Sequence, residues 1–332
     1  MAEAKRLLVL TRDRANAAFR QRIEPYLGAL AAGGIEAEVV ELAECPWTRT
    51  SQLRRCREFD GVLLHRKTLT WWDGRCLGAA RRLIYDFDDA VMFQARAPDR
   101  PHPGRMRRFR RTMARADLVI AGNPFLADHA DMAGAAFAEI LPTGLDAGRF
   151  TPKEKYDHRG GLRLVWIGSK STLKQLQMLR PMLEALGRAV PGAALRIIAD
   201  AGLEVPGLRV ENVPWRLEDE ARLLAECDIG IAPMPDTPFT RGKCGFKVLQ
   251  YMAAGLPVVT SPVGVSAEYV EPEATGLHAR TPEEWVAAVG RLAADADLRK
   301  RMGRAGRRRA EEEFDFGVLQ PRFVELIADA LA

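Results

Sequence analysis

Short apolar runs alternate with helix-length amphipathic segments along the first half of the chain. The run RLLVL at 6–10 precedes an amphipathic stretch over 17–32 that ends at a pair of glycines, and a second apolar run follows at 36–42. Further β-branched or apolar runs occupy 60–65, 82–87, 117–121 and 138–142. Apolar strands separated by helices are typical of a parallel sheet that is covered on both faces. The first half therefore predicts a Rossmann-like domain.

The same alternation begins again after a polar interruption. Residues 146–160 are rich in turn formers and charge, and a strand at 162–168 and a helix over 172–189 are expected after them. Further strands are expected at 194–199, 208–213, 228–234 and 256–261. From residue 282 onward the pattern is almost entirely helical.

This pattern predicts an α/β protein with two doubly wound, Rossmann-like domains that face a central cleft. We expect the first domain at 1–150, the second at 151–315, and a helix at 316–332 that packs back toward the first domain. Ligands of such sheets bind outside the carboxyl ends of the strands. Loops that follow strands are therefore the candidates for function.

Composition narrows the class of protein. A chain of 332 residues fits two domains, and 47% hydrophobic residues are enough for real cores. The net charge of +5 rests on arginine usage and does not by itself predict nucleic-acid binding. The five cysteines are odd in number and never form a CxxC pair, which argues against a disulfide framework or a zinc site. With no bilayer-length apolar run and no recognisable signal peptide, we expect a cytoplasmic protein.

Near the start of an apolar segment, one lysine is followed by a second lysine four residues later and by a glutamine seven residues later. A helix that begins near Gly242 would place Lys243, Lys247 and Gln250 on one face. Like charges at this spacing repel unless an anion lies between or above them. A glycine-flanked helix N-terminus also favours phosphate. The segment is thus a candidate phosphate site, and a solvated lysine face is the alternative.

A second candidate follows the strand at 162–168. Gly168, Ser169, Lys170, Thr172 and Lys174 lead from the strand into a helix, without the spacing of a P-loop. The hydroxyl groups could donate to phosphate oxygens and either lysine could supply the charge. Alternatively, a hydroxyl of Ser171 or Thr172 only caps the helix.

A third candidate lies after the strands at 60–65 and 82–87. Asp86 and Asp88 form a DxD pair, which suggests a divalent metal only weakly, because aspartates also close turns. His65 and Arg66 end the preceding strand and point toward the same region. One acidic and one basic group could together hold a polyhydroxylated acceptor. A structural role for His65 is the alternative.

The segment from Arg105 to Arg111 predicts a strongly basic helix. Such helices dock on anionic membrane surfaces or acidic partners, although a solvated face is the more common case. Trp215 follows the strand at 208–213, where it could stack on a nucleobase or belong to the core.

Several of these motifs resemble glycosyltransferase family 4, the retaining group 1 glycosyltransferases of the GT-B fold. The run GKCGFKVLQYMAAGLPVVTSPVG, followed by GLHARTPEEW, is similar to their carboxyl-terminal domain. RLIYDFDDAVM, ADLVIAGNPFLADHA and ILPTGLDAGRF resemble the amino-terminal domain of a compact subgroup, and LVWIGSKSTLKQL resembles the start of the donor domain.

The resemblance implies roles for individual residues, and it also shows departures. The family's two glutamates, which have seven residues between them, correspond to Gly242 and Gln250, so this chain lacks the usual pair. The implied catalytic residues are Lys247, Lys174 and Asp88, the last of which stands about where many relatives have histidine. The implied donor-binding residues are Gly168, Ser169, Lys170, Thr172, Lys174, Trp215, Gly242, Lys243, Cys244, Gly245, Phe246, Lys247 and Gln250. The implied acceptor-binding residues are Arg20, His65, Arg66, Asp86, Asp88 and Asn123.

The implied activity is transfer of a hexosyl unit from a nucleotide-diphosphate sugar to a hydroxyl group, with retention at the anomeric carbon. The acceptor is a glycan, a lipid-linked sugar or a small molecule, and no metal, other cofactor or nucleic acid is expected. Basic side chains and helix dipoles would stabilise the departing diphosphate, which would itself assist as the base. A sugar-nucleotide epimerase of the same fold and a non-catalytic partner subunit are the alternatives. Contact of the Arg105–Arg111 helix with the inner membrane surface is a further expectation.

Overall fold

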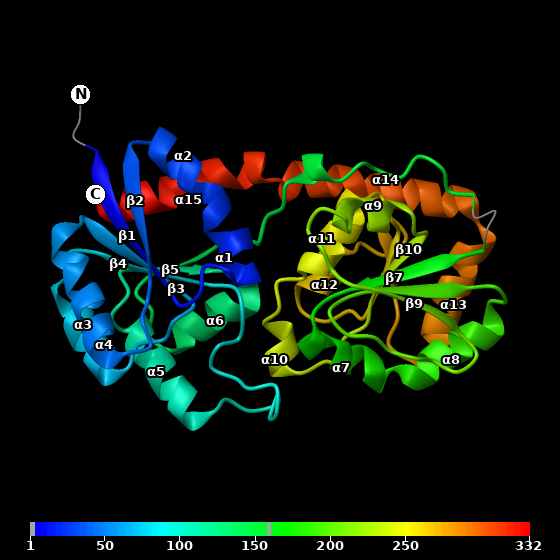
Figure 1. The fold of residues 1–332 in the computed structure, drawn as a ribbon, viewed down its shortest axis with the longest axis horizontal. Helices are drawn as coiled ribbons and strands as arrows, with labels where there is room; N and C mark the ends of the chain where they lie inside the picture. The colour runs from blue at the N-terminus through cyan, green and yellow to red at the C-terminus, as the bar shows by residue number, and fades with distance from the viewer. Residues whose placement is uncertain (1–3, 158–160) are drawn as a thin grey trace. The chain divides into compact units, whose positions relative to one another are not determined.

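The computed structural model describes residues 4–157 and 161–332, so the last three residues of the expected linker lie outside it. The chain divides into two compact units (Figure 1). Unit 1 contains Met1–Gly144, Thr237–Cys244 and Phe316–Ala332, and unit 2 contains Leu145–Asp236 and Gly245–Asp315. The chain passes between units at 144/145 and 315/316, and it also returns to unit 1 for the short segment Thr237–Cys244.

Unit 1 is built on a six-stranded parallel sheet with the order β2-β1-β3-β4-β5-β6. Its strands are β1 (Lys5–Thr11), β2 (Ile35–Glu41), β3 (Gly61–His65), β4 (Leu83–Phe87), β5 (Leu118–Ala121) and β6 (Ala138–Ile140). Its α-helices are α1 (Ala17–Arg22), α2 (Leu27–Ala32), α3 (Pro46–Arg54), α4 (Trp71–Cys76), α5 (Pro103–Met113), α6 (Pro124–Met132), α10 (Pro238–Arg241) and α15 (Phe316–Leu331). Short 3-10 helices lie at η1 (Glu24–Tyr26), η2 (Arg55–Glu58) and η3 (Leu77–Ala79).

Unit 2 has its own six-stranded parallel sheet, with the order β12-β11-β10-β7-β8-β9. Its strands are β7 (Arg163–Ile167), β8 (Ala194–Ile198), β9 (Arg209–Val213), β10 (Ile229–Ala232), β11 (Val258–Thr260) and β12 (Gly276–His278). Its helices are η4 (Ala147–Arg149), α7 (Lys170–Met178), α8 (Arg180–Ala189), α9 (Glu220–Ala225), α11 (Phe246–Ala253), α12 (Val265–Tyr269), α13 (Pro282–Ala294) and α14 (Ala296–Glu313).

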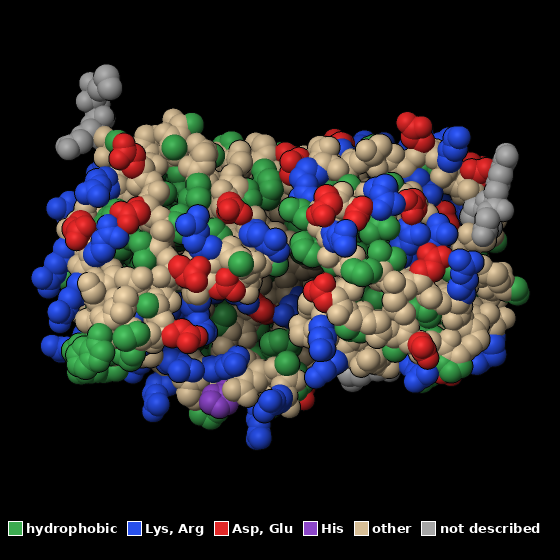
Figure 2. All heavy atoms as spheres, viewed as in Figure 1, with side chains coloured by type: hydrophobic (Ala, Val, Ile, Leu, Met, Phe, Trp, Pro, Cys, Tyr) green, Lys and Arg blue, Asp and Glu red, His purple; other side chains and the backbone are tan. Residues whose placement is uncertain are grey.

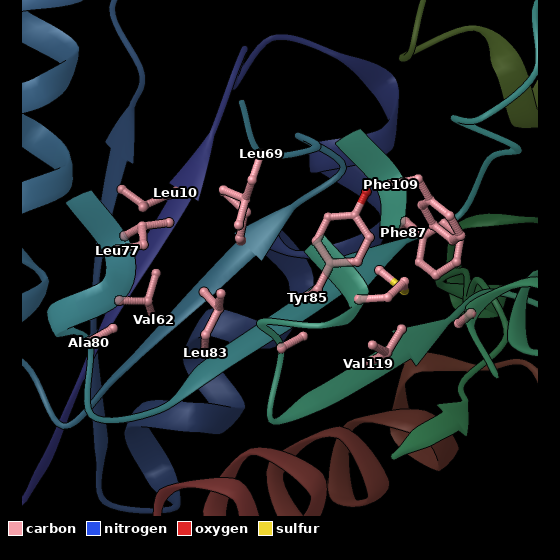
Figure 3. Packing of buried hydrophobic residues seen from close by; sticks show 14 of the residues in the cluster. Leu10, Val62, Leu69, Leu77, Ala80, Leu83, Tyr85, Phe87, Phe109 and Val119 are labelled. Atoms are coloured by element: carbon pink, nitrogen blue, oxygen red, sulfur yellow. The ribbon is translucent and has the colours of Figure 1, made fainter. Parts of the chain in front are cut away.

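Each sheet separates two hydrophobic clusters, because successive side chains of a strand point to opposite faces. In β1, Leu8 and Leu10 belong to one cluster, whereas Leu7 and Val9 belong to the other. Figure 3 shows the first cluster, in which residues of the strands pack against Leu69, Leu77 and Phe109. The second cluster includes apolar residues of α15, which completes unit 1 with a segment from the far end of the chain.

Strand order identifies where each sheet can bind a ligand. In unit 1 the chain places β2 on one side of β1 and β3 on the other, so the direction of winding reverses between β1 and β3. In unit 2 the reversal lies between β7 and β10. A crevice forms at the carboxyl ends of the two strands at such a switch point.

Two expected helices are interrupted by proline, which lacks the N–H group that a helix interior requires. The helix expected over 17–32 divides into α1, η1 and α2 around Pro25, and the one over 172–189 divides into α7 and α8 before Pro181. Strand β12 was not expected. The described residues include no helix with the length and apolar character needed to cross a bilayer.

The expected helix start near Gly242 is wrong. Helix α11 begins at Phe246, with Gly245 as its N-cap in the left-handed conformation at φ 61°. Gly242 instead caps the end of the short helix α10. Lys243 is therefore outside α11 and belongs to unit 1, whereas Lys247 lies on α11 in unit 2.

Candidate functional site

A pocket of about 1140 Å³ lies at the switch point of unit 1. Thr11 ends β1 and His65 ends β3, and both side chains line the pocket. Of the expected acceptor contacts, His65 and Arg66 line it, whereas Arg20, Asp86, Asp88 and Asn123 are not among its lining residues. The position agrees with the rule that open parallel sheets bind ligands at a switch point.

His65 presents an unpartnered nitrogen in this region. The residue is only 3% exposed, its Nδ1 lies 3.2 Å from Thr11 Oγ1, and its Nε2 has no hydrogen-bond partner. Burial lowers the pKa of His65 to about 4, and the nearby Arg66 and Arg22 add to this effect against Asp88. The imidazole is thus neutral at neutral pH and can make one more hydrogen bond to a ligand.

Four charged side chains alternate in sign beside His65. Arg66 Nε lies 3.2 Å from Asp88 Oδ1, and Arg66 Nη2 lies 3.0 Å from Asp89 Oδ2. Lys243 Nζ is the last member of this series of ion pairs and lies 3.0 Å from Asp89 Oδ1. Arg66 adopts φ 57°, an uncommon conformation for a residue with a side chain, and such strain concentrates at functional sites.

Asp88 remains ionised in this arrangement. Its burial works to raise its pKa, but Arg66 and Arg22 outweigh burial and hold the pKa of Asp88 below the ordinary value. A carboxylate at this place can accept hydrogen bonds from hydroxyl groups, which is compatible with the expected contact to a polyhydroxylated acceptor.

Asp86 is buried and paired with an arginine, so its role is structural. It is fully buried, and its Oδ1 accepts a hydrogen bond of 2.8 Å from Arg22 Nε. Arg22 also donates to the carbonyl oxygen of Leu141 at 2.8 Å. Burial raises the pKa of Asp86 to about 6 although Arg22 opposes the shift. The two members of the DxD pair thus face different arginines. Among the described residues, no group of three or more His, Cys, Asp and Glu side chains is placed to hold a metal ion.

Asn123, Cys244 and Gly242 attach the segment Thr237–Cys244 to the rest of unit 1. Asn123 caps α6 through a 2.9 Å bond from Leu126 N, and its Nδ2 donates to Lys243 O at 3.3 Å. Cys244 Sγ donates to Asp88 O at 3.0 Å. A Cβ on Gly242 would lie 2.6 Å from the Cβ of Ala90. Close packing within unit 1 therefore accounts for these residues, which were expected to contact acceptor or donor.

We expect His65 to make stability depend on pH. Its folded pKa of about 4 lies below the ordinary 6.5, so the unfolded chain binds more protons between these values and stability falls as the pH falls through that window. Urea denaturation of wild type and His65→Gln should show the difference between the two proteins shrinking toward about pH 4. Asp86 acts in the opposite direction but is present in both proteins, so it cancels in the difference.

The control for this measurement is Met132→Gln, which places the same side chain at an exposed position of α6 and neither adds nor removes a titratable group. Its stability curve should run parallel to that of wild type. Parallel curves for wild type and His65→Gln as well would contradict the assignment.

In unit 2, residues of the second sequence candidate gather at the carboxyl end of β7. The ammonium group of Lys247 lies 4.2 Å from the centroid of the Trp166 ring. A Cβ on Gly168 would lie 2.5 Å from the Trp166 ring and 2.7 Å from Thr172 Oγ1, so only glycine fits there. Lys247, Gly168 and Thr172 therefore surround the end of β7, at one strand of the switch point between β7 and β10.

The hydroxyl groups at the start of α7 are engaged in capping. Thr172 Oγ1 accepts a hydrogen bond of 3.0 Å from Ser169 N, and Ser169 Oγ lies 2.8 Å from Ser171 Oγ. Lys170 and Lys174 are exposed on the same helix. The capping interpretation thus holds for Thr172, and the lysines remain available to a ligand.

The remaining expected donor residues have mixed surroundings. Gln250 is only 5% exposed on α11, one turn from Lys247. Trp215 donates from Nε1 to Glu220 Oε2 at 2.8 Å and packs partly buried against a hydrophobic cluster, which agrees with the core interpretation. Phe246 packs against the same cluster at the start of α11.

Sequence reasoning missed several residues of these sites. The basic side chains of the unit 1 pocket that it did not single out are Arg12, Arg49 and Lys67. Arg12 directly follows β1 and Lys67 closely follows β3, so the rule that strand ends carry function could have identified both. Trp166 was treated only as part of an apolar strand, and nothing local distinguishes it from a core residue.

Comparisons with known proteins show which families and folds this chain is similar to. Residues 161–295 match the family model described as glycosyl transferases group 1. A D-inositol 3-phosphate glycosyltransferase of Segniliparus rotundus is 27% identical over 221 residues, which are 58% of this chain and 48% of that protein. An MMP alpha-(1->4)-mannosyltransferase of Mycolicibacterium hassiacum is also 27% identical, over 58% of this chain and 48% of that protein. The matches thus span about half the length of these curated relatives.

Solved structures are similar over almost the whole chain. Anabaena HepE, in complex with UDP and glucose, has a TM-score of 0.76 and 16% identity, with 98% of this chain and 100% of that chain covered. The sucrose-phosphate synthase of Thermosynechococcus elongatus has a TM-score of 0.75 and 15% identity, with 98% of each chain covered. Identity this low carries information on the fold alone. Residues 161–295 therefore match the group 1 glycosyl transferases, and the two Rossmann-like α/β units have the GT-B fold of solved glycosyltransferases.

Proposed function

We propose that the protein transfers a hexosyl unit from a nucleotide-diphosphate sugar to a hydroxyl acceptor, with retention of anomeric configuration. The observation that carries the proposal is the cluster of Lys247, Gly168 and Thr172 around the end of β7, inside the region that matches the family model. A glycine at a strand end, a following helix N-terminus and a fixed ammonium group are what a diphosphate requires. HepE, of similar fold, was solved in complex with UDP-glucose.

Unit 2 supplies the donor site in this proposal. Lys247 and Lys174 neutralise the charge that develops on the diphosphate as the sugar departs, and the amide groups at the start of α7 add to that field. The departing diphosphate takes the proton of the acceptor hydroxyl. No metal ion is required, because these cationic groups do the electrostatic work.

Unit 1 supplies the acceptor site, with His65, Arg66 and Asp88 as contacts. The charges of its pocket differ with depth. Three acidic lining residues, Asp13, Glu41 and Glu44, are exposed and the fourth, Asp89, is half-buried, whereas five basic lining residues are half-buried: Arg49, Arg66, Lys67, Arg105 and Arg108. A single carboxylate, that of Asp73, pairs with both Arg49 and Lys67, at 3.3 and 2.7 Å. The excess of positive charge favours an acceptor that carries an anionic group as well as hydroxyl groups.

A donor screen tests the activity. The protein is incubated with uridine, guanosine and adenosine diphosphate sugars and with sugar phosphates or neutral sugars as acceptors, and the products are analysed by mass spectrometry and NMR. We expect one nucleoside diphosphate to be released and one acceptor to gain the mass of a hexose, with the donor's anomeric configuration. A donor of unchanged mass and new stereochemistry would indicate an epimerase. No turnover of any donor, together with a co-purifying protein, would indicate a partner subunit.

We place the protein in the cytoplasm, with helix α5 against the inner surface of the membrane. The side chains of Arg107 and Arg110 on this helix are exposed, whereas Arg105 and Arg108 line the pocket. One face of the basic helix is therefore exposed and another lines the pocket, since residues three or four apart lie on the same face of a helix.

A further inference from the structure

Three tryptophans on the surface of unit 1 have no place in the transfer reaction. Trp47 on α3 is 84% exposed, and Trp71 and Trp72 on α4 are 61% and 45% exposed. Tryptophan is unfavourable on a water-exposed surface, because its ring has a large apolar area that cores and interfaces normally bury. In Figure 2 hydrophobic side chains gather over α3 and α4, with Lys and Arg around them.

Contacts between the helices bring these rings to one surface. Trp72 Nε1 donates to Thr50 Oγ1 at 2.8 Å, and Thr50 lies three residues after Trp47, on the same side of α3. The Trp71 and Trp72 rings lie 6.2 Å apart. Arg75 stands one turn after Trp71 and places its guanidinium group 5.4 Å from the centre of the Trp71 ring.

Helix α5 continues this surface on the other side of α4. A Cβ on Gly74 would lie 3.5 Å from the Arg111 side chain, so the two helices are in contact there. Arg107 lies one turn before Arg111 on α5, and Arg115, two residues beyond the end of the helix, donates to Leu77 O at 3.0 Å. A row of arginines therefore flanks the tryptophans.

Negative charge is missing from this surface. Residues 45–57, 66–85 and 100–116 contain a single acidic residue, Asp73. Asp73 is fully buried and pairs with Arg49 and Lys67. Within the described chain, Arg54, Arg75, Arg107 and Arg110 have no carboxylate partner. The surface formed by α3, α4 and α5 thus combines exposed indole rings with uncompensated positive charge.

We propose that the surface of α3, α4 and α5 docks on a bilayer that contains anionic lipids, with Trp47 and Trp71 inserted at the headgroup level. Indole rings prefer the interface between water and hydrocarbon, and arginines near a membrane gain from the negative surface potential. A neutral protein partner would leave the arginines unpaired. This surface adds α3 and α4 to the membrane contact proposed for α5, and its binding to lipid does not depend on the transfer reaction.

Vesicle flotation with the full-length protein tests this docking. Vesicles of phosphatidylcholine alone are compared with vesicles of phosphatidylcholine and phosphatidylglycerol in equal amounts. Wild type is expected to float only with the second kind, and added salt should release it because screening weakens the attraction. The double variant Trp47→Ser, Trp71→Ser should bind about tenfold or more weakly, since it loses the inserted rings but keeps the arginines.

The matched control is Phe137→Ser, which removes another exposed aromatic side chain of unit 1, 70% exposed, and should bind like wild type. Thermal melting of each variant shows whether it is folded. Unchanged flotation of the double variant, or no binding of wild type to either vesicle, would overturn the proposal. So would a wild-type dimer that the double variant converts to a monomer without any vesicle binding, because the rings would then cover a second copy of the chain. Hexosyl transfer to a soluble acceptor should be equal in all these proteins.

Discussion

Replacing Lys247 with methionine is expected to lower the affinity for a nucleoside diphosphate by about tenfold or more and the transfer rate by about 10²–10³-fold. The half-buried Lys247 side chain holds its ammonium group over the buried Trp166 ring at the end of β7, where a charge is less screened than in bulk water and acts more strongly on phosphate. Methionine retains an apolar chain over the ring and removes only the charge. The measurements are the shift in melting temperature with the diphosphate and the steady-state rate with a donor sugar.

Two further variants make this result specific. Lys300→Met removes an exposed lysine of α14 in the same unit and should leave both quantities unchanged. Lys247→Arg keeps a cation and should restore part of the affinity. Lys243→Met tests whether Lys243 belongs to unit 1 and not to the donor site, because Lys243 pairs with Asp89 in unit 1. A diphosphate shift that Lys247→Met leaves intact would contradict the donor site.

The largest effect on stability is expected from Arg22→Met. Arg22 and Asp86 are 2% and 0% exposed, and their side chains are joined at 2.8 Å. Removal of one member of such a pair leaves an uncompensated charge in the core and costs about 3–5 kcal/mol of unfolding free energy. Loss of the bond from Arg22 to Leu141 O adds to the cost. Urea denaturation measures the change.

An exposed pair in the same unit provides the comparison. Arg81 and Asp60 lie at a similar distance, 3.0 Å, but the Arg81 side chain is 69% exposed, so Arg81→Met should cost no more than about 1 kcal/mol. The double variant Arg22→Met, Asp86→Leu removes both charges and should be more stable than Arg22→Met. If Arg22→Met and Arg81→Met cost the same, the buried pair does not have the structural role assigned to it.

Much of the fold could be predicted from sequence, because buried strands require local runs of hydrophobic residues. Most strands of both sheets are apolar runs, and eleven of the twelve described strands lie at or within a few residues of an expected position. Strand β12 escaped because Gly276–His278 is too short to show a pattern. The divided helices could have been placed better, since Pro25 and Pro181 are visible in the sequence and proline has a known effect on helices.

The first residue of a helix is harder to predict from sequence than the position of a strand, as the segment at 242–250 shows. Spacing alone put Lys243 and Lys247 on one helical face. The left-handed conformation of Gly245 delays the helix to Phe246, and the packing of Gly242 on Ala90 keeps the preceding residues in unit 1. Both depend on neighbours that are distant in sequence, so no local pattern reports them.

The sequence by itself determined which chemical groups stand at strand ends: Gly168 and the hydroxyl groups after β7, and His65 and Arg66 after β3. It could do so because strand ends follow from hydrophobic pattern alone. Only the tertiary structure decided which of these groups meet. It paired Asp86 with Arg22, joined Lys243 to Asp89, and set Lys247 over Trp166. The physical reason is that charges and rings act over a few ångströms, and the residues that come within that distance are selected by packing between elements far apart in the chain.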